Sequence, residues 1–237
     1  EFSLMSFSDG KTLKHMPTVQ DHKRAFAGDI GPNTGGMGTY SNHDHSLPFL
    51  IDSDIEEAQY INETTAKALK IEFGEGYKGI LYGGFMATAK GVKLIEYNAR
   101  FGDPECQVLM LRLKSDLVPA LMATAIGDIS DLDLEWFDED AMTVVMAAQG
   151  YPGSYSKGTE IDGLDSAVAD SDTQIFHAGT KTEDGKTLAV GGRVLNVTSK
   201  GQDLNAARDK AYAALEKIDW EEGFYRRDIG WRALDEI

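Results

Sequence analysis

The segment from residue 80 to residue 99 most constrains the fold, because it predicts a β-hairpin. Two apolar runs, at 80–87 and 92–99, flank the polar dipeptide Lys90-Gly91. Apolar runs of this length around a short turn containing glycine are typical of two antiparallel strands. We therefore expect an antiparallel sheet in this part of the chain.

The segments before this hairpin predict further strands and a long helix. Residues 1–16 alternate between apolar and polar side chains around Asp9-Gly10, which predicts two strands joined by a tight turn. Residues 53–73 place apolar side chains at helical spacing, and Ser53 is the expected N-cap of that helix.

The segment after the hairpin predicts two helices in succession. Residues 104–127 are helical in composition, with an expected break near Lys114. Ser115 is the expected cap of the second helix, and Asp116 would lie in its first turn. Sheet and helices together predict an α+β fold.

An acidic segment separates two predicted domains. Residues 128–140 hold seven acidic side chains and no basic one, which is typical of a solvated surface segment. We interpret it as a linker between a domain at 1–127 and a small α+β domain at 141–237. The expected elements of the second domain are strands at 141–148, 174–178 and 188–197 and a helix at 203–218.

Composition excludes several classes of function. The net charge of −16, without a local cluster of basic residues, argues against nucleic acid and anionic membrane surfaces as partners. No apolar run approaches the roughly 18 residues that span a bilayer. The single cysteine, Cys106, fits a reducing compartment, so the cytoplasm is the expected location. Because the chain opens inside a hairpin and without Met, we expect it to be the C-terminal part of a longer polypeptide.

The sharpest chemical signal is the pattern Glu96, Asn98 and Arg100 at the end of the predicted hairpin. Alternate residues of a strand share one side, so these three side chains would point the same way. A carboxylate and an amide oxygen suit Mg²⁺ bound together with a substrate phosphate, and a guanidinium suits a carboxylate or a phosphate. The alternative is that these side chains form only an exposed row of opposite charges on one face of the strand, without a bound ligand.

A glycine-rich segment is the second candidate. Residues 31–38 predict an irregular loop, whose backbone N–H groups could line an anion site or could serve only as a turn. It is not a Walker A loop, since Met37 stands where lysine is required. Just before it, Asp21 and Lys23 lie in a run of four ionisable residues, which is either a surface charge cluster or part of a site.

Several motifs in the same order resemble one known family. The chain is similar over nearly its whole length to the phosphoribosylamine–glycine ligases, also called glycinamide ribonucleotide synthetases, of the ATP-grasp superfamily. The segments that carry the resemblance are 20–24, 31–38, 96–105, 113–117, 150–153, 176–180, 191–195 and 228–232. The resemblance implies the second half of an ATP-grasp domain, with an antiparallel sheet and helices, followed by the small C-terminal domain.

The resemblance also implies an activity. It predicts an ATP-dependent carbon–nitrogen ligase of purine biosynthesis that joins glycine to 5-phosphoribosylamine through glycyl phosphate and releases ADP and phosphate. Glu96 and Asn98 match the family's ligands for Mg²⁺ or Mn²⁺. The residues expected to act in catalysis are Arg100 and Lys23, and those expected to bind substrate are Asp21, Gly35, Gly36 and Asp103.

One departure from the family limits the prediction. Family members carry further segments that hold ATP ahead of the point where this chain begins, so we expect these 237 residues alone neither to bind ATP tightly nor to turn over. Two other hypotheses stay open: another ATP-grasp carboxylate–amine ligase or carboxylase, and a non-catalytic module of a purine-pathway protein.

Overall fold

The computed structural model describes residues 1–234, which form two compact units interleaved along the chain. The first unit comprises Glu1–Gln20, Ser41–Gly102 and Arg112–Asp138, and the second comprises Asp21–Tyr40, Asp103–Leu111 and the described part of Glu139–Ile237. The division differs from the expected consecutive domains at 1–127 and 141–237, because the segments Asp21–Tyr40 and Asp103–Leu111 pack within the second unit. The last three residues of the expected second domain lie outside the described residues.

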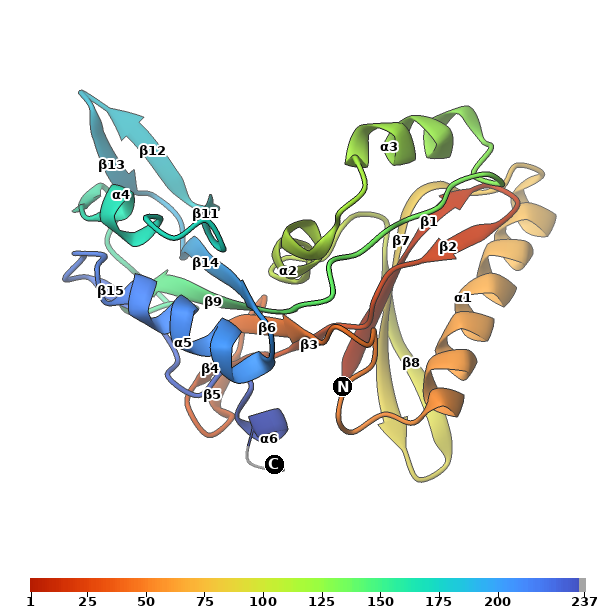
Figure 1. Ribbon diagram of the computed structural model, residues 1–237, viewed down its shortest axis with the longest axis horizontal. Helices are drawn as coiled ribbons and strands as arrows, with labels where there is room; N and C mark the ends of the chain where they lie inside the picture. The colour runs from red at the N-terminus through yellow and green to blue at the C-terminus, as the bar shows by residue number, and fades with distance from the viewer. Residues whose placement is uncertain (235–237) are drawn as a thin grey trace. The chain divides into compact units, whose positions relative to one another are not determined.

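The first unit contains a four-stranded antiparallel sheet (Figure 1). Its strands, in the order β2-β1-β7-β8, are β1 (Phe2–Asp9), β2 (Leu13–His15), β7 (Lys78–Thr88) and β8 (Gly91–Asn98). Both predicted hairpins are confirmed, since β1 pairs with β2 and β7 pairs with β8. Every residue of β1 is buried, so this strand forms the centre of the unit's core.

The long helix α1 (Asp52–Phe73) packs against β7 and β8. Ser53 was the wrong N-cap, because the helix begins one residue earlier and Ile51 is its N-cap. The Ile51 N–H donates to the Asp54 carboxylate at 3.1 Å. A side chain in the first turn therefore provides the hydrogen-bond acceptor for the backbone N–H of the N-cap residue. The helix ends at Gly74, whose φ of 77° is a left-handed conformation that favours glycine.

The two predicted helices after the hairpin are α2 (Glu105–Arg112) and α3 (Leu117–Ile126). Ser115 was the wrong cap for α3. Asp116 is the N-cap, because its carboxylate accepts from the Val118 N–H at 2.9 Å, whereas the Ser115 hydroxyl accepts from the Glu135 N–H at 2.8 Å. None of the helices in residues 1–234 has the length and apolar character needed to cross a membrane.

A six-stranded sheet forms the centre of the second unit (Figure 1). Its strand order is β11-β14-β9-β6-β3, with β15 paired to β9. The bounds are β3 (Gln20–Asp21), β6 (Gly38–Ser41), β9 (Asp140–Ala148), β11 (Thr173–His177), β14 (Arg193–Gly201) and β15 (Gly223–Phe224). Helix α5 (Leu204–Leu215) packs against β9 and β14, and the Asp203 carboxylate caps it by accepting from the Ala206 N–H at 2.8 Å.

Smaller elements complete this unit. A three-stranded sheet has the order β10-β13-β12, with β10 (Thr159–Ile161), β12 (Thr180–Glu183) and β13 (Lys186–Ala189), and the short helices are α4 (Leu164–Ala167) and α6 (Trp231–Leu234). The strand predicted at 188–197 is in fact two strands, β13 and β14, because the chain leaves one sheet and enters another at Val190–Gly192.

The glycine-rich segment is more regular than predicted. Strand β4 (Arg24–Phe26) pairs antiparallel with β5 (Ile30–Asn33), and β6 begins at Gly38. The irregular loop is therefore confined to residues 34–37. The Arg24 guanidinium donates to the Gly31 carbonyl at 2.7 Å and ties the two strands together.

Candidate functional site

Glu96 and Asn98 lie together at the end of β8 in the first unit. The Asn98 amide nitrogen donates to Glu96 Oε1 at 3.3 Å, so the two side chains share one side of the strand as the period of two predicts. Glu96 is exposed and Asn98 is half-buried. A ligand can therefore reach the pair from solvent.

Arg100 does not belong to the same strand. Strand β8 ends at Asn98, and the Arg100 guanidinium donates to the Phe101 carbonyl at 2.7 Å. A register shift opposite Gly84 and Phe85 also interrupts the alternation before Glu96. The expectation that strand alternation extends to Arg100 was therefore wrong, and the role of this residue stays a prediction.

The donor set of Glu96 and Asn98 fits a hard divalent cation. The amide donates to Glu96 through its nitrogen, which leaves its oxygen as a second oxygen ligand beside the carboxylate. Within residues 1–234 no group of three or more His, Cys, Asp or Glu side chains could hold a metal ion. Two oxygen ligands suit a cation that keeps water and phosphate ligands, as Mg²⁺ does.

In the second unit, Arg193 at the start of β14 holds the irregular loop at 34–37. Its Nη1 donates to the carbonyls of Gly35 at 2.9 Å, Gly36 at 3.3 Å and Asp103 at 2.7 Å. Its Nη2 donates to Asp103 Oδ2 at 2.9 Å, which is also an ion pair. One guanidinium therefore joins the glycine loop to Asp103, two residues before α2 begins.

Glycine lies in close contact with other side chains at both positions of this loop, and Gly36 also has a backbone conformation that favours glycine. A Cβ on Gly36 would lie 2.6 Å from Asp21 Oδ1 and 2.5 Å from Pro104 Cδ, and the φ of Gly36 is 118°. A Cβ on Gly35 would lie 2.9 Å from Arg193 Cζ. The two glycines thus allow the backbone to lie directly against the Asp21 carboxyl and the Arg193 guanidinium.

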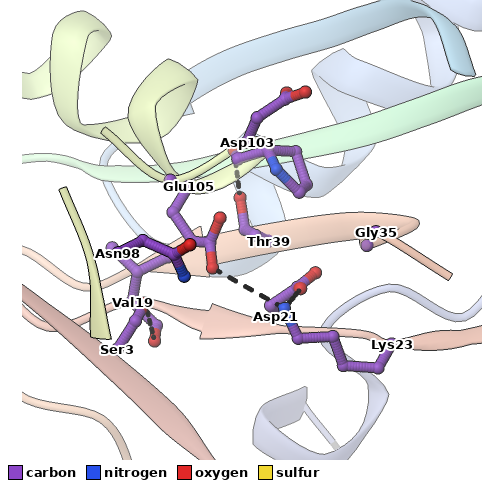
Figure 2. A network of polar contacts seen from close by, with 12 residues as sticks. Ser3, Val19, Asp21, Lys23, Gly35, Thr39, Asn98, Asp103 and Glu105 are labelled. Atoms are coloured by element: carbon purple, nitrogen blue, oxygen red, sulfur yellow. Dashed lines mark hydrogen bonds and ion pairs between the residues drawn. The ribbon is translucent and has the colours of Figure 1, made fainter. Parts of the chain in front are cut away.

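Asp21, Lys23 and Glu105 form a second cluster in the same unit (Figure 2). Lys23 Nζ lies 2.6 Å from Asp21 Oδ2 and 4.0 Å from Glu105 Oε1. Figure 2 shows the Lys23 side chain reaching between the two carboxyl groups. Burial, and after it the nearby Glu105 carboxylate, raises the pKa of Asp21 to about 7.

An ionic cluster around the buried Arg226 guanidinium anchors the β4–β5 hairpin. The Arg226 guanidinium pairs with Asp228 and with Asp29, each at 2.9 Å. His22 Nδ1 lies 3.0 Å from the Gly38 carbonyl, and the Gly230 N–H donates to His22 Nε2 at 3.1 Å. Burial, with a smaller contribution from Arg226, lowers the pKa of His22 to about 4, so its ring is neutral.

The structure brings together all the site residues that the sequence predicted in this unit, namely Asp21, Lys23, Gly35, Gly36 and Asp103. Two further members, Glu105 and Arg193, had no assigned role. The only sequence signal for them is that they stand inside motifs shared with the family. Burial, followed by Asp103 and Glu105, raises the pKa of the Cys106 thiol to about 11, which disfavours the reactive thiolate.

Comparison with solved structures gives the class of fold. A biotin carboxylase from Campylobacter jejuni superposes with a TM-score of 0.68 at 14% identity, covering 94% of this chain and 46% of that chain. At this identity the likeness shows the fold alone. Residues 1–106 match the family model "Phosphoribosylglycinamide synthetase, ATP-grasp (A) domain", so the chain carries part of an ATP-grasp domain.

The particular family follows from the rest of the chain. Residues 141–232 match the model "Phosphoribosylglycinamide synthetase, C domain". A phosphoribosylamine–glycine ligase from Agrobacterium fabrum is 50% identical over 234 residues, and the corresponding enzyme from Thermotoga maritima superposes with a TM-score of 0.82 at 35% identity. The chain belongs to the phosphoribosylglycinamide synthetase family.

The match covers this chain almost completely but only part of each relative. It spans 99% of this chain and 54% of the Agrobacterium protein, and 97% of this chain and 55% of the Thermotoga chain. A relative from Arabidopsis thaliana, named a chloroplastic phosphoribosylamine–glycine ligase, is 48% identical and is covered to 44%. The chain thus spans about half the length of the curated relatives it matches.

Proposed function

We propose that this chain is the part of a phosphoribosylamine–glycine ligase that supplies the metal-binding pair and the glycine loop. The whole enzyme would use ATP to join glycine to 5-phosphoribosylamine, with glycyl phosphate as the intermediate. The observation that carries the proposal is the clustering of Asp21, Lys23, Gly35, Gly36 and Asp103 in a chain about 50% identical to enzymes of that name.

The chemistry demands that a carboxylate approach a triphosphate, so charge neutralisation and positioning should supply most of the acceleration. Glu96 and Asn98 would hold Mg²⁺ or Mn²⁺, which neutralises negative charge on the phosphates when bound. Arg100, exposed beyond β8, would hold the acyl phosphate through its guanidinium.

The second unit would position the substrates. The Lys23 ammonium, partly exposed, would stabilise an anionic group. Arg193 keeps the Gly35 and Gly36 carbonyls turned toward itself, which fixes the shape of the loop that we propose lies over substrate. The Asp103 side chain is 42% exposed, and its accessible carboxylate oxygen would bind the substrate amine.

The test is ADP release that depends on both glycine and phosphoribosylamine, measured on a protein in which this chain is joined to the preceding segments of a family member. Glu96→Ala and Asn98→Ala should abolish Mg²⁺-dependent turnover, since each removes one of two oxygen ligands. Asp131→Ala, an exposed acidic residue outside the cluster, should leave turnover unchanged. No ADP release from the parent protein would overturn the proposal.

We also propose that the chain alone neither binds ATP tightly nor turns over, because it spans about half of its relatives. Micromolar affinity for ATP in isothermal titration of the 237 residues would contradict this.

The cytoplasm is the proposed location, which cell fractionation can check. Another ATP-grasp ligase or carboxylase is the second candidate, favoured only by the biotin carboxylase fold likeness, and substrate profiling of the joined protein decides between them.

A further inference from the structure

Every backbone N–H group of the loop at 34–37 already donates a hydrogen bond to an acceptor inside the second unit. The four acceptors are the Lys23 carbonyl for Thr34 at 2.8 Å, the Tyr151 hydroxyl for Gly35 at 3.2 Å, the Thr34 hydroxyl for Gly36 at 3.0 Å and the His22 carbonyl for Met37 at 2.9 Å. A loop that binds an anion needs free N–H groups that converge on it. This loop can offer one only if an internal hydrogen bond opens.

Two carbonyl groups of the loop accept hydrogen bonds from a cation of the chain itself. Arg193 Nη1 donates to the Gly35 and Gly36 carbonyls, and the same guanidinium donates to the carbonyl and the carboxylate of Asp103. Because the N–H donors of a guanidinium have fixed directions, acceptors on two of its nitrogens hold it in one orientation. The loop and Arg193 therefore fix each other.

Tyr151, which follows β9, connects the loop to the start of β14 by a second path. Its hydroxyl accepts the Gly35 N–H, and its ring lies so close to Gly192 that a Cβ at that position would clash with it. Gly192 directly precedes Arg193 in the chain. Tyr151 thus contacts both the loop and the backbone that carries Arg193.

The contact with Tyr151 lies at the exposed position of the loop. Gly35 is exposed, whereas Gly36 and Met37 are buried. The residue whose N–H is held by Tyr151 is also the one whose carbonyl is held by Arg193. Loss of the Tyr151 hydroxyl would therefore free the outermost part of the loop beside the guanidinium.

We propose that Tyr151 is a positioning residue, which acts through Gly35 to keep the loop and Arg193 in one fixed arrangement. The loop then offers the substrate a preformed surface rather than free N–H groups, and Tyr151 itself does not contact the substrate. The effect on catalysis rests on the proposed function, whereas the fixed loop concerns this chain alone.

Tyr155 provides a matched control for Tyr151. The two rings are half-buried and pack edge to face, with 6.4 Å between their centroids. Within residues 1–234 the Tyr155 hydroxyl has no hydrogen-bond partner. Tyr151→Phe and Tyr155→Phe thus each remove one hydroxyl from neighbouring rings, and only the first removes an acceptor of the loop.

The fixed loop can be tested on this chain by exchange of single amide protons with water, measured by NMR. Tyr151→Phe should speed the exchange of the Gly35 N–H about tenfold, because one hydrogen bond is lost, and should leave the Met37 N–H unchanged. Tyr155→Phe should change neither. Gly192→Ala, which displaces the Tyr151 ring but keeps its hydroxyl, should also speed the Gly35 exchange.

An unchanged Gly35 exchange rate in folded Tyr151→Phe overturns the inference, and so does an equal change in Tyr155→Phe. Circular dichroism establishes folding, and Gly192→Ala decides by the same criterion if Tyr151→Phe does not fold. Inorganic phosphate added to the parent chain should leave the exchange of the Gly35 and Gly36 N–H groups unchanged. Slower exchange with phosphate means that the loop binds the anion directly, which also overturns the inference.

The positioning role is tested by a double-mutant cycle in the joined protein described above. Tyr151→Phe should lower kcat about tenfold in the parent but about twofold or less in the Arg193→Lys background, because both residues act through the same loop. Tyr155→Phe should leave kcat unchanged. The same loss in both backgrounds means that Tyr151 contacts substrate itself or only supports folding, and it overturns the inference.

Two further outcomes separate this inference from the proposed function. Unchanged kcat in an active Tyr151→Phe protein contradicts the positioning role but not the proposed function. A parent protein without ADP release contradicts the proposed function and with it the positioning role, while the amide exchange rates still decide whether Tyr151 fixes the loop.

Discussion

Arg226 and Asp228 are joined by two parallel hydrogen bonds, from Nε to Oδ1 and from Nη2 to Oδ2, both 2.9 Å long. Asp228 also accepts the Gly28 N–H at 2.7 Å, and the Arg226 Nη1 donates to the Arg24 carbonyl at 3.0 Å. The C-terminal segment thereby anchors the β4–β5 hairpin. Since this hairpin leads into the glycine loop, the anchor maintains the position of the candidate site.

Replacing Arg226 should destabilise the chain strongly. Its side chain is 1% exposed, and Arg226→Ala leaves Asp228 without its cation and Asp29 with the exposed Arg232, whereas breaking a buried pair typically costs about 3–5 kcal/mol. Arg232 pairs with the same Asp29 at 2.8 Å but is 58% exposed, so Arg232→Ala should cost about 1 kcal/mol or less. Urea unfolding of both variants measures the difference. Equal losses would contradict the anchor.

His22 should make stability depend on pH below neutrality. Its pKa is about 4 in the folded chain against an ordinary value of 6.5, so the unfolded chain binds the extra proton first. This contribution is complete above pH 6.5 and is lost as pH falls toward 4, by up to about 3 kcal/mol in total. His22→Gln should flatten the dependence of unfolding free energy on pH between 6.5 and 4, whereas His177→Gln, at an exposed ring, should not.

Gly36→Ala should be far more damaging than a glycine substitution in the neighbouring turn. A Cβ on Gly36 meets the Asp21 carboxyl and Pro104, whereas a Cβ on Gly28 has no atom within 4 Å, although its φ of 74° is also positive. Gly28→Ala should therefore cost only the left-handed backbone penalty, about 1–2 kcal/mol. Thermal unfolding should give a clearly larger loss for Gly36→Ala. A loss no larger than that of Gly28→Ala would mean that the close contact is unimportant.

Arg193→Lys should loosen the loop at 34–37 while keeping the positive charge. A lysine ammonium cannot reproduce the fork by which Arg193 Nη1 donates to the Gly35 and Asp103 carbonyls while Nη2 donates to the Asp103 carboxylate. Hydrogen exchange of the peptide containing the Gly35 and Gly36 amides should become faster in this variant. Arg227→Ala, at an exposed guanidinium over the Tyr225 ring, is the control and should leave that exchange rate unchanged.

Local patterns were enough for the hairpins. The turns at Lys90-Gly91 and Asp9-Gly10, with apolar runs on both sides, correctly predicted which strands pair. The same local period of two correctly placed Glu96 beside Asn98. Helix caps were less predictable. Ser53 and Ser115 were both plausible caps, yet residues one or two positions away serve instead. Asp116 competes with Ser115 for the same N–H groups, and the backbone of Ile51 enters the first helix before Ser53 is reached.

The sequence by itself predicted both hairpins of the first unit, the main helices, the family motifs and which residues are candidates for the site. The tertiary structure alone decided that Glu105 approaches Lys23 and that Arg193 holds the glycine loop. Periodicity reports only which neighbours share a side of one element, over a few residues. Contacts between residues far apart in the chain depend on how sheets and helices pack, and the burial that raises the pKa of Asp21 arises only from that packing.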